Sequence, residues 1–217
     1  MDTSFVVDLL GTLCYIALAL VALWGAYSVI FAWRSISMAR FRSEESQEAF
    51  LGELDDKLRT GDFDAAAELC DGDERAMPKL VVMALSHRSM GYAKLRAYVV
   101  DRFQRDVLAD IEHRVSWVNT VIKSAPMLGL FGTVLGMMGA FAKIAAGDKV
   151  DTTLLAQDIS LALITTALGL AIAIPLTLCT TSLAARIRQL EDLVGVGLTR
   201  LFESLRPQLA EQPAEGK

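Results

Sequence analysis

The sequence predicts an all-α membrane protein with three transmembrane helices, long cytoplasmic helical extensions and a small helical cytoplasmic domain. The mean hydropathy of the 217 residues is +0.39, and 53% of them are hydrophobic. More decisively, three stretches contain no Asp, Glu, Lys or Arg: Leu9–Trp33, Ala125–Ala142 and Ile159–Ala185. A helix needs about 20 apolar residues to cross about 30 Å of hydrocarbon. The alternative is that these helices are buried inside a large soluble protein, but the remaining sequence is too small to cover three such helices.

Residues 1–33 are expected to form a periplasmic stub and the first transmembrane helix. A secretory signal peptide is the alternative interpretation of an apolar N-terminal segment. Met1–Asp8 contains no Lys or Arg, and the apolar run exceeds the roughly 7–15 residues of a signal core. We therefore expect a helix that is retained in the mature protein.

Residues 34–120 are expected to form a cytoplasmic helical domain, because Lys and Arg gather on the cytoplasmic side of membrane helices. The N-terminal stub contains no base, whereas basic residues flank the inner ends of all three spans: Arg34, Arg40, Arg42, Arg102, Arg105, Arg114, Lys123, Arg186 and Arg188. This distribution predicts a periplasmic N-terminus and a cytoplasmic C-terminus. A helix running from about Ala93 is expected to continue into the second span.

The second half of the chain divides into four predicted segments. They are the second transmembrane helix (121–145), a short periplasmic loop (146–157), the third transmembrane helix (158–185) and a cytoplasmic C-terminal helix and tail (186–217). The uncharged part of the second span is short, but Val115–Ile122 extends it. Lys123 and Lys143 can reach the headgroups from within it.

Small residues line one face of each of the last two spans. Residues three or four apart share a helix face, and glycine costs about 1 kcal/mol inside a helix. Glycine spacing by itself favours plain helix packing, as between other membrane helices. Threonines on the same faces also allow a cavity that holds water or another helix. The face residues are Gly129, Gly132, Gly136, Gly139 and Thr133 in the second span, and Ala162, Thr166, Gly169, Ala173 and Thr177 in the third.

No carboxylate lies inside any predicted span, although Asp158 stands at the outer edge of the third. Protein groups that relay protons through a membrane are usually titratable, so conduction would need an acid from another chain. Asp158 and Thr165 are accessory candidates. The three cysteines have no metal-like spacing, and we interpret them as unpaired thiols.

The composition and motifs exclude several functional classes. The net charge of −5 argues against a nucleic-acid partner. The sequence contains no P-loop, nucleophile elbow or HExxH motif, so we expect neither an enzyme nor a bound cofactor or metal.

Each of the last two spans contains a distinctive segment. The segments are Ser124–Phe141, which reads SAPMLGLFGTVLGMMGAF, and Ile159–Pro175, which reads ISLALITTALGLAIAIP. Both resemble motifs of the MotA/TolQ/ExbB proton-channel family. Both the order and the separation of the segments agree with that family, and the three-span layout resembles its ExbB/TolQ branch. The resemblance implies a stator subunit in the bacterial inner membrane. Five copies would surround a dimer of single-span, ExbD/TolR-like partners, whose Asp takes up and releases the proton.

By the same resemblance, Thr133 and Thr166 match two pore-facing threonines. The expected function is to use the proton motive force for an envelope process such as TonB-dependent import or Tol-type envelope maintenance. Leu161 stands where ExbB and TolQ typically carry Glu, which sets this chain apart from them. Two alternatives stay open: a sodium-driven stator of the same family, and a non-conducting membrane scaffold.

Overall fold

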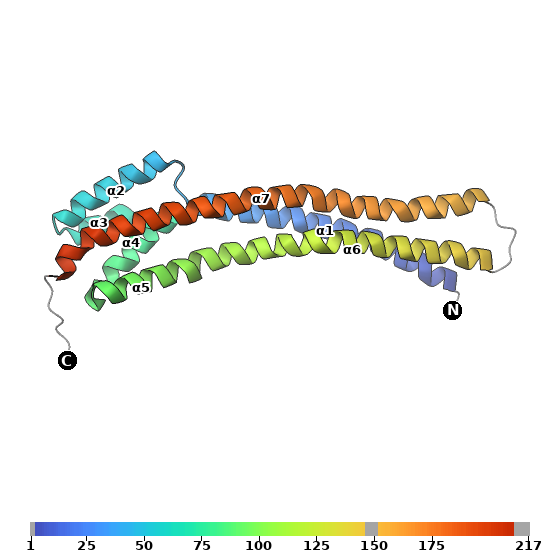
Figure 1. Cartoon of the computed structure of the whole chain (residues 1–217), viewed down its shortest axis with the longest axis horizontal. Helices are drawn as coiled ribbons and strands as arrows, with labels where there is room; N and C mark the ends of the chain where they lie inside the picture. Colours follow the sequence, from blue (N-terminus) through green and yellow to red (C-terminus); the bar gives the residue numbers. More distant parts are fainter. Residues whose placement is uncertain (1–2, 146–151, 211–217) are drawn as a thin grey trace. The chain divides into compact units, whose positions relative to one another are not determined.

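The computed structural model describes residues 3–145 and 152–210, and every regular element in these ranges is helical (Figure 1). The elements are α1 (Thr3–Ala39), α2 (Glu44–Arg59), α3 (Phe63–Cys70), α4 (Ala76–Ser86), a 3₁₀ turn (Arg88–Met90), α5 (Tyr92–Arg102), a π-helical segment (Phe103–Leu108), α6 (Ala109–Ala145) and α7 (Thr152–Ala210). Helices α1, α6 and α7 each contain a stretch long and apolar enough to cross a membrane. The predicted all-α membrane fold with three such helices is confirmed.

The helix boundaries differ from the expectation at one place. Helix α7 begins at Thr152, whereas residues 146–157 were expected to form a loop. Residues 152–157 contain neither glycine nor proline, so nothing in their sequence prevents a helix. The other part of that expected loop, residues 146–151, lies outside the described residues. As expected, the helical path from α5 leads through the π-helical segment into α6 without a break.

The chain forms two compact units, to which α1, α6 and α7 all contribute. The first contains the described residues of 1–31 and 114–182, and the second those of 32–113 and 183–217. The first unit holds the uncharged stretches apart from residues 32–33 and 183–185.

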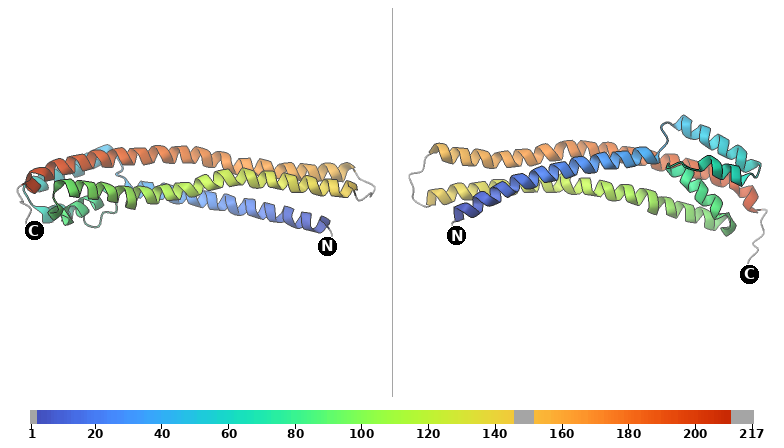
Figure 2. Two further views of the ribbon diagram at one scale, coloured as in Figure 1. Left: turned by 60° about the horizontal axis from the view of Figure 1, so that its bottom comes forward. Right: turned by 180° about the vertical axis from the view of Figure 1, so that it is seen from behind.

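In the first unit, α1, α6 and α7 lie side by side (Figures 1 and 2). A small cluster of buried apolar side chains, Val118, Val121 and Leu176, joins α6 to α7. Gly25 brings α1 against this cluster, because a Cβ there would lie 2.8 Å from Leu176 Cδ1 and 2.9 Å from Val121 Cγ1. In the most apolar stretch of each long helix, only 22% to 28% of the residues are buried. The remaining apolar surface is available to lipid or to other chains.

In the second unit, α2, α4 and α5 contact the C-terminal part of α7 and share an apolar core with it. Ser43 begins α2 with a capping box, in which its hydroxyl accepts a hydrogen bond from the Ser46 backbone N–H and the Ser46 hydroxyl accepts one in return. The core residues include Leu54, Leu58, Met77, Val81, Leu95, Val99, Leu201 and Leu205. Gly197 allows α7 to approach α4 closely, since a Cβ at Gly197 would lie only 2.9 Å from Met77 Sδ.

A buried carboxylate fixes α2 to α7 in this unit. Asp55 is 8% exposed. One of its oxygens accepts a hydrogen bond from Arg200 Nε at 2.6 Å and the other accepts one from Ser204 Oγ at 2.7 Å.

Replacing Asp55 with alanine is expected to lower the free energy of unfolding by about 1–3 kcal/mol, because two donors lose a charged acceptor. Thermal unfolding of the full chain in detergent, followed by circular dichroism, measures the change. Asp56→Ala is the matched control, because Asp56 is the exposed neighbour. Equal effects of the two substitutions would contradict this role for Asp55.

All three cysteines are free, as expected. Cys70 lies at the end of α3 in the second unit, where burial and, to a smaller extent, the Asp73 carboxylate raise the pKa of its thiol from 9.0 to about 11. Because the thiolate is the reactive form, this shift lowers the reactive fraction at pH 8 about 100-fold.

We therefore expect Cys70 to react with iodoacetamide about 100-fold more slowly at pH 8 than an exposed thiol. The rate should rise about tenfold per pH unit as the pH increases toward 11. The experiment uses the Cys14→Ala, Cys179→Ala background, and the control moves the thiol to the exposed position Glu68 on the same helix. Equal rates at the two positions would show that Cys70 is accessible and unshifted.

Candidate functional site

The glycine face of α6 meets the small-residue face of α7 at backbone distance. A Cβ built on Gly129 would lie 2.6 Å from the Thr165 carbonyl oxygen and 2.9 Å from Thr166 Cα. At Gly132 a Cβ would lie 2.5 Å from Thr165 Oγ1. Real Cβ atoms do not approach other atoms this closely, so α6 and α7 can lie together here only because both positions are glycine.

The contact continues in both directions along the pair. Toward the C-terminal end of α6, a Cβ on Gly136 would lie 2.5 Å from Ala162 Cβ. Toward the N-terminal end of α6, the glycine is on α7 instead, and a Cβ on Gly169 would lie 2.5 Å from the Ala125 carbonyl oxygen. The two small-residue faces that the sequence predicts therefore pack on each other within one chain.

Thr165 stands at the centre of this contact. It is 3% exposed, and its hydroxyl lies 2.9 Å from the Gly129 carbonyl oxygen of α6 and 2.7 Å from the Ala162 carbonyl oxygen of its own helix. A hydrogen bond between helices is favourable in a membrane, where water does not compete for the donor. By its sequence Thr165 is only an accessory candidate, but in the structure its hydroxyl links the two motif helices.

The two predicted pore-facing threonines have different surroundings. Thr133 is buried on α6 and donates its hydroxyl to the Leu130 carbonyl oxygen at 2.6 Å. The Thr166 Oγ1 atom is also buried, yet it has no hydrogen-bond partner within residues 3–145 and 152–210. A pore-lining role stays a prediction for both residues.

The lack of a partner for Thr166 has a local cause. A threonine in a helix commonly donates to the carbonyl three or four positions earlier, as Thr177, Thr180 and Thr181 all do. For Thr166 the carbonyl four positions earlier belongs to Ala162, and the Thr165 hydroxyl already lies at that oxygen. Thr165 thus occupies one of the two carbonyls to which the Thr166 hydroxyl could donate within its own helix.

The remaining face residues divide between the two surfaces of α7. Ala162, Gly169 and Ala173 are buried, whereas Thr177 is exposed and donates to the Ala173 carbonyl oxygen at 2.8 Å. Gly139 on α6 is half-buried. The predicted stripe on α7 is therefore covered within the chain as far as Ala173 and open beyond it.

A cavity of about 270 Å³ lies between α1, α6 and α7, at the end of the first unit that contains Lys143 and Asp158. It borders Thr165, and the Tyr15 hydroxyl on its wall donates to the Leu161 carbonyl oxygen at 2.9 Å. At the same end Lys143 Nζ lies 2.6 Å from Asp158 Oδ2. Asp158 thus pairs with a base of the same chain. The side chain of Leu161, at the position of the family's usual Glu, is exposed.

The sequence analysis did not identify the packing face of α1. Cys14 Sγ donates to the Leu128 carbonyl oxygen at 3.2 Å, in addition to the contact of Gly25 with Val121 and Leu176. Cys14, Leu18, Gly25 and Ser28 are all buried, and they recur at intervals of four, seven and three. This helical spacing was the signal that could have identified the face.

The described side chains suit packing and hydrogen bonding rather than metal chemistry. Within the two described ranges, no group of three or more His, Cys, Asp or Glu side chains could hold a metal ion. The site consists of two helices that pack closely at glycines. On α7, the Thr165 hydroxyl bridges the two helices, and the adjacent Thr166 hydroxyl has no hydrogen-bond partner in the described residues.

Comparison with known proteins shows that the α6–α7 pair lies in a region shared with a protein family. Residues 91–194, which include both motifs, match the MotA/TolQ/ExbB proton channel family. The biopolymer transport protein ExbB of Aquifex aeolicus is 33% identical over 122 residues, which cover 54% of this chain and 82% of that protein. The chain belongs to the MotA/TolQ/ExbB proton channel family. The family match begins at Gly91, at the start of α5, and ends within α7.

Two further relatives come from other organisms. A putative biopolymer transport protein ExbB homolog of Methanothermobacter thermautotrophicus is 32% identical over 158 residues, or 71% of this chain and 54% of that protein. The Tol-Pal system protein TolQ of Haemophilus influenzae is 36% identical over 88 residues, or 41% of this chain and 39% of that protein. The chain thus spans about half of the first relative and less of the second.

Proposed function

We propose that this chain is a proton-conducting stator subunit of an ExbB/TolQ-like complex in the bacterial inner membrane. In this proposal the N-terminus is periplasmic, residues 34–120 and the C-terminal part of α7 are cytoplasmic, and five copies surround a dimer of single-span partners. The proton motive force would drive an envelope process such as TonB-dependent import or Tol-type envelope maintenance. The chain itself carries out no enzymatic reaction.

The observation that carries this proposal is the buried Thr166 hydroxyl, which lacks a partner in the described part of the chain. A buried polar group without a hydrogen bond costs about 1–3 kcal/mol, and the cost is not reduced by water in a membrane. The hydroxyl lies in a motif of a proton-channel family. A water molecule or a carboxylate of another chain would satisfy it and would at the same time be the group that handles the proton.

The distribution of acids supports the same conclusion. The three uncharged stretches contain no carboxylate, and Asp158 at the outer end of α7 is paired with Lys143. A chain built in this way needs a titratable group from a partner, which agrees with a single-span protein carrying an intramembrane Asp.

The test is ion flux through the purified complex. The chain is co-expressed with a candidate single-span protein whose span contains an Asp, sought first in the adjacent reading frame, and the complex is reconstituted into liposomes containing a pH-sensitive dye. We expect acidification that follows an imposed proton gradient and that disappears when the partner's Asp becomes Asn.

The same liposomes distinguish the alternatives. A sodium-driven stator would require external sodium at fixed pH, because hydroxyl-lined sites can bind either ion. A scaffold whose glycine faces only pack helices would give no flux with either ion and no partner in the purified complex, and this outcome would overturn the proposal.

A further inference from the structure

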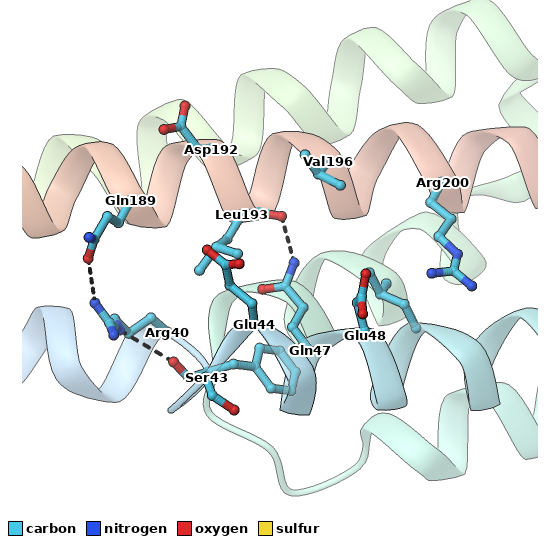
Figure 3. A pocket seen from close by; sticks show the side chains of 12 residues that line it. Arg40, Ser43, Glu44, Gln47, Glu48, Gln189, Asp192, Leu193, Val196 and Arg200 are labelled. Carbon is cyan, nitrogen blue, oxygen red and sulfur yellow. Dashed lines mark hydrogen bonds between the residues drawn. The ribbon is translucent and has the colours of Figure 1, made fainter.

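A groove in the second unit is lined by both apolar and acidic side chains (Figure 3). It encloses about 400 Å³ between the start of α2 and the C-terminal part of α7. Gln47 closes its base, because this buried side chain donates to the Leu193 carbonyl oxygen at 2.6 Å. None of the site residues described above lines this groove, so it has no part in the proposed conduction.

The carboxylates on its walls outnumber the bases that could neutralise them. Glu48 on α2 and Asp192 on α7 are both exposed, and neither has an ion pair or hydrogen bond within residues 3–145 and 152–210. Glu44 is a third acid, although its place in the first turn of α2 already suits the helix dipole. Two acids on opposite walls therefore lack a structural partner.

The two bases in the groove are already in use. Arg200 is paired with Asp55. Arg40 donates from Nη1 to Gln189 Oε1 at 3.0 Å and from Nε to the Phe41 carbonyl oxygen at 3.3 Å. Even if Arg40 offsets one carboxylate, the lining retains a negative excess. A segment that carries Lys or Arg complements it.

The groove also presents an exposed apolar side chain outside the uncharged stretches. Val196 on α7 is 67% exposed, whereas Phe41 and Leu51, which also line the groove, are buried. An exposed valine among unpaired acids is suited to a segment in which basic and apolar side chains alternate. A purely basic peptide would leave this surface uncovered.

The position of the groove along the chain selects the occupant. The groove residues of α7 lie between positions 189 and 200. They follow Ala185, the last residue of the third uncharged stretch, by about 6–22 Å along a continuous helix. A polypeptide that leaves a membrane span covers this distance with roughly seven extended residues. Single-span proteins with a cytoplasmic end carry Lys and Arg next to the span.

We propose that this groove binds the basic cytoplasmic segment that adjoins the membrane span of the single-span partner. The inference rests on the proposed function, since it assumes that partner. The contact anchors the partner at its cytoplasmic end, away from the site at Thr166.

The test places the photo-crosslinking amino acid p-benzoylphenylalanine at Val196 of the full chain, co-expressed with the tagged single-span protein. We expect a crosslink to the cytoplasmic flank of that protein, located by mass spectrometry. The matched control carries the crosslinker at Val82, an exposed valine of α4 in the same unit and 37% exposed. Val82 should give no crosslink to the partner.

Charge reversal gives a second readout. Glu48→Lys combined with Asp192→Lys should reduce the crosslink at Val196 about tenfold, and replacing the partner's basic residues with Glu should restore it. Circular dichroism of the double variant verifies the fold.

The possible outcomes separate the two proposals. An intact complex in which Val196 crosslinks to a second copy, to another protein or to nothing would overturn the groove assignment alone. A preparation without any single-span protein would overturn the proposed function and this inference together.

Discussion

Replacing Thr166 with valine is expected to reduce proton flux through the reconstituted complex about tenfold without destabilising the protein. Valine has nearly the shape of threonine and removes only the hydroxyl. That hydroxyl has no partner within the described part of the chain, so its loss costs the isolated chain no hydrogen bond. Removing one hydrogen bond from the conducting complex costs about 1.5 kcal/mol, which is about tenfold in rate.

Three matched substitutions make this result specific. Thr181→Val removes a hydroxyl that donates to the Thr177 carbonyl oxygen and lies outside both motifs, so flux should not change. Thr166→Ser keeps the hydroxyl and should retain most of the flux. Thr165→Val removes the interhelix hydrogen bond and should lower the thermal stability. If Thr166→Val and Thr181→Val conduct equally well, Thr166 has no part in conduction.

Introducing a methyl group at the α6–α7 contact is expected to have the largest effect on stability. Gly129→Ala and Gly169→Ala should each lower the free energy of unfolding by about 1–3 kcal/mol or more, because the new Cβ meets backbone that cannot rotate away. The colliding atoms are the Thr165 carbonyl oxygen at 2.6 Å and the Ala125 carbonyl oxygen at 2.5 Å. Unfolding in a graded mixture of mild detergent and sodium dodecyl sulfate, followed by circular dichroism, measures the change.

Gly195→Ala is the control, and it should act in the opposite direction. Gly195 lies on the same helix as Gly169, but nothing lies within 4 Å of a Cβ built there. Alanine should therefore stabilise the helix by about 0.5–1 kcal/mol. A similar loss for all three variants would mean that α6 and α7 do not approach as closely as described.

The sequence was sufficient for the three long helices because charge-free stretches are a direct consequence of the hydrocarbon environment. It was also sufficient for the faces of α6 and α7, since Gly129, Gly132 and Gly136 repeat at helical spacing. It left open whether those faces meet or line a cavity, and they meet within one chain.

The roles of Thr165 and Thr166 could not be separated from the sequence. Adjacent residues on a helix differ by about 100° in direction, so the rotation of α7 decides which hydroxyl turns toward Gly129. The groove at Glu48 and Asp192 could not be predicted from the sequence either, because it depends on how α2 folds back onto α7. The packing face of α1, in contrast, could have been predicted from the helical spacing of Cys14, Leu18 and Gly25.

The glycine contact between α6 and α7 also constrains how force passes through the protein. Backbone atoms that touch at Gly129 and Gly169 block small sliding movements of one helix along the other. A shift to the next equivalent register requires a full turn, about 5.4 Å. The α6–α7 pair is therefore expected to resist sliding of one helix along the other. In the proposed stator, any sliding that accompanies work would then occur where this chain meets other molecules, or in segments without such a close contact.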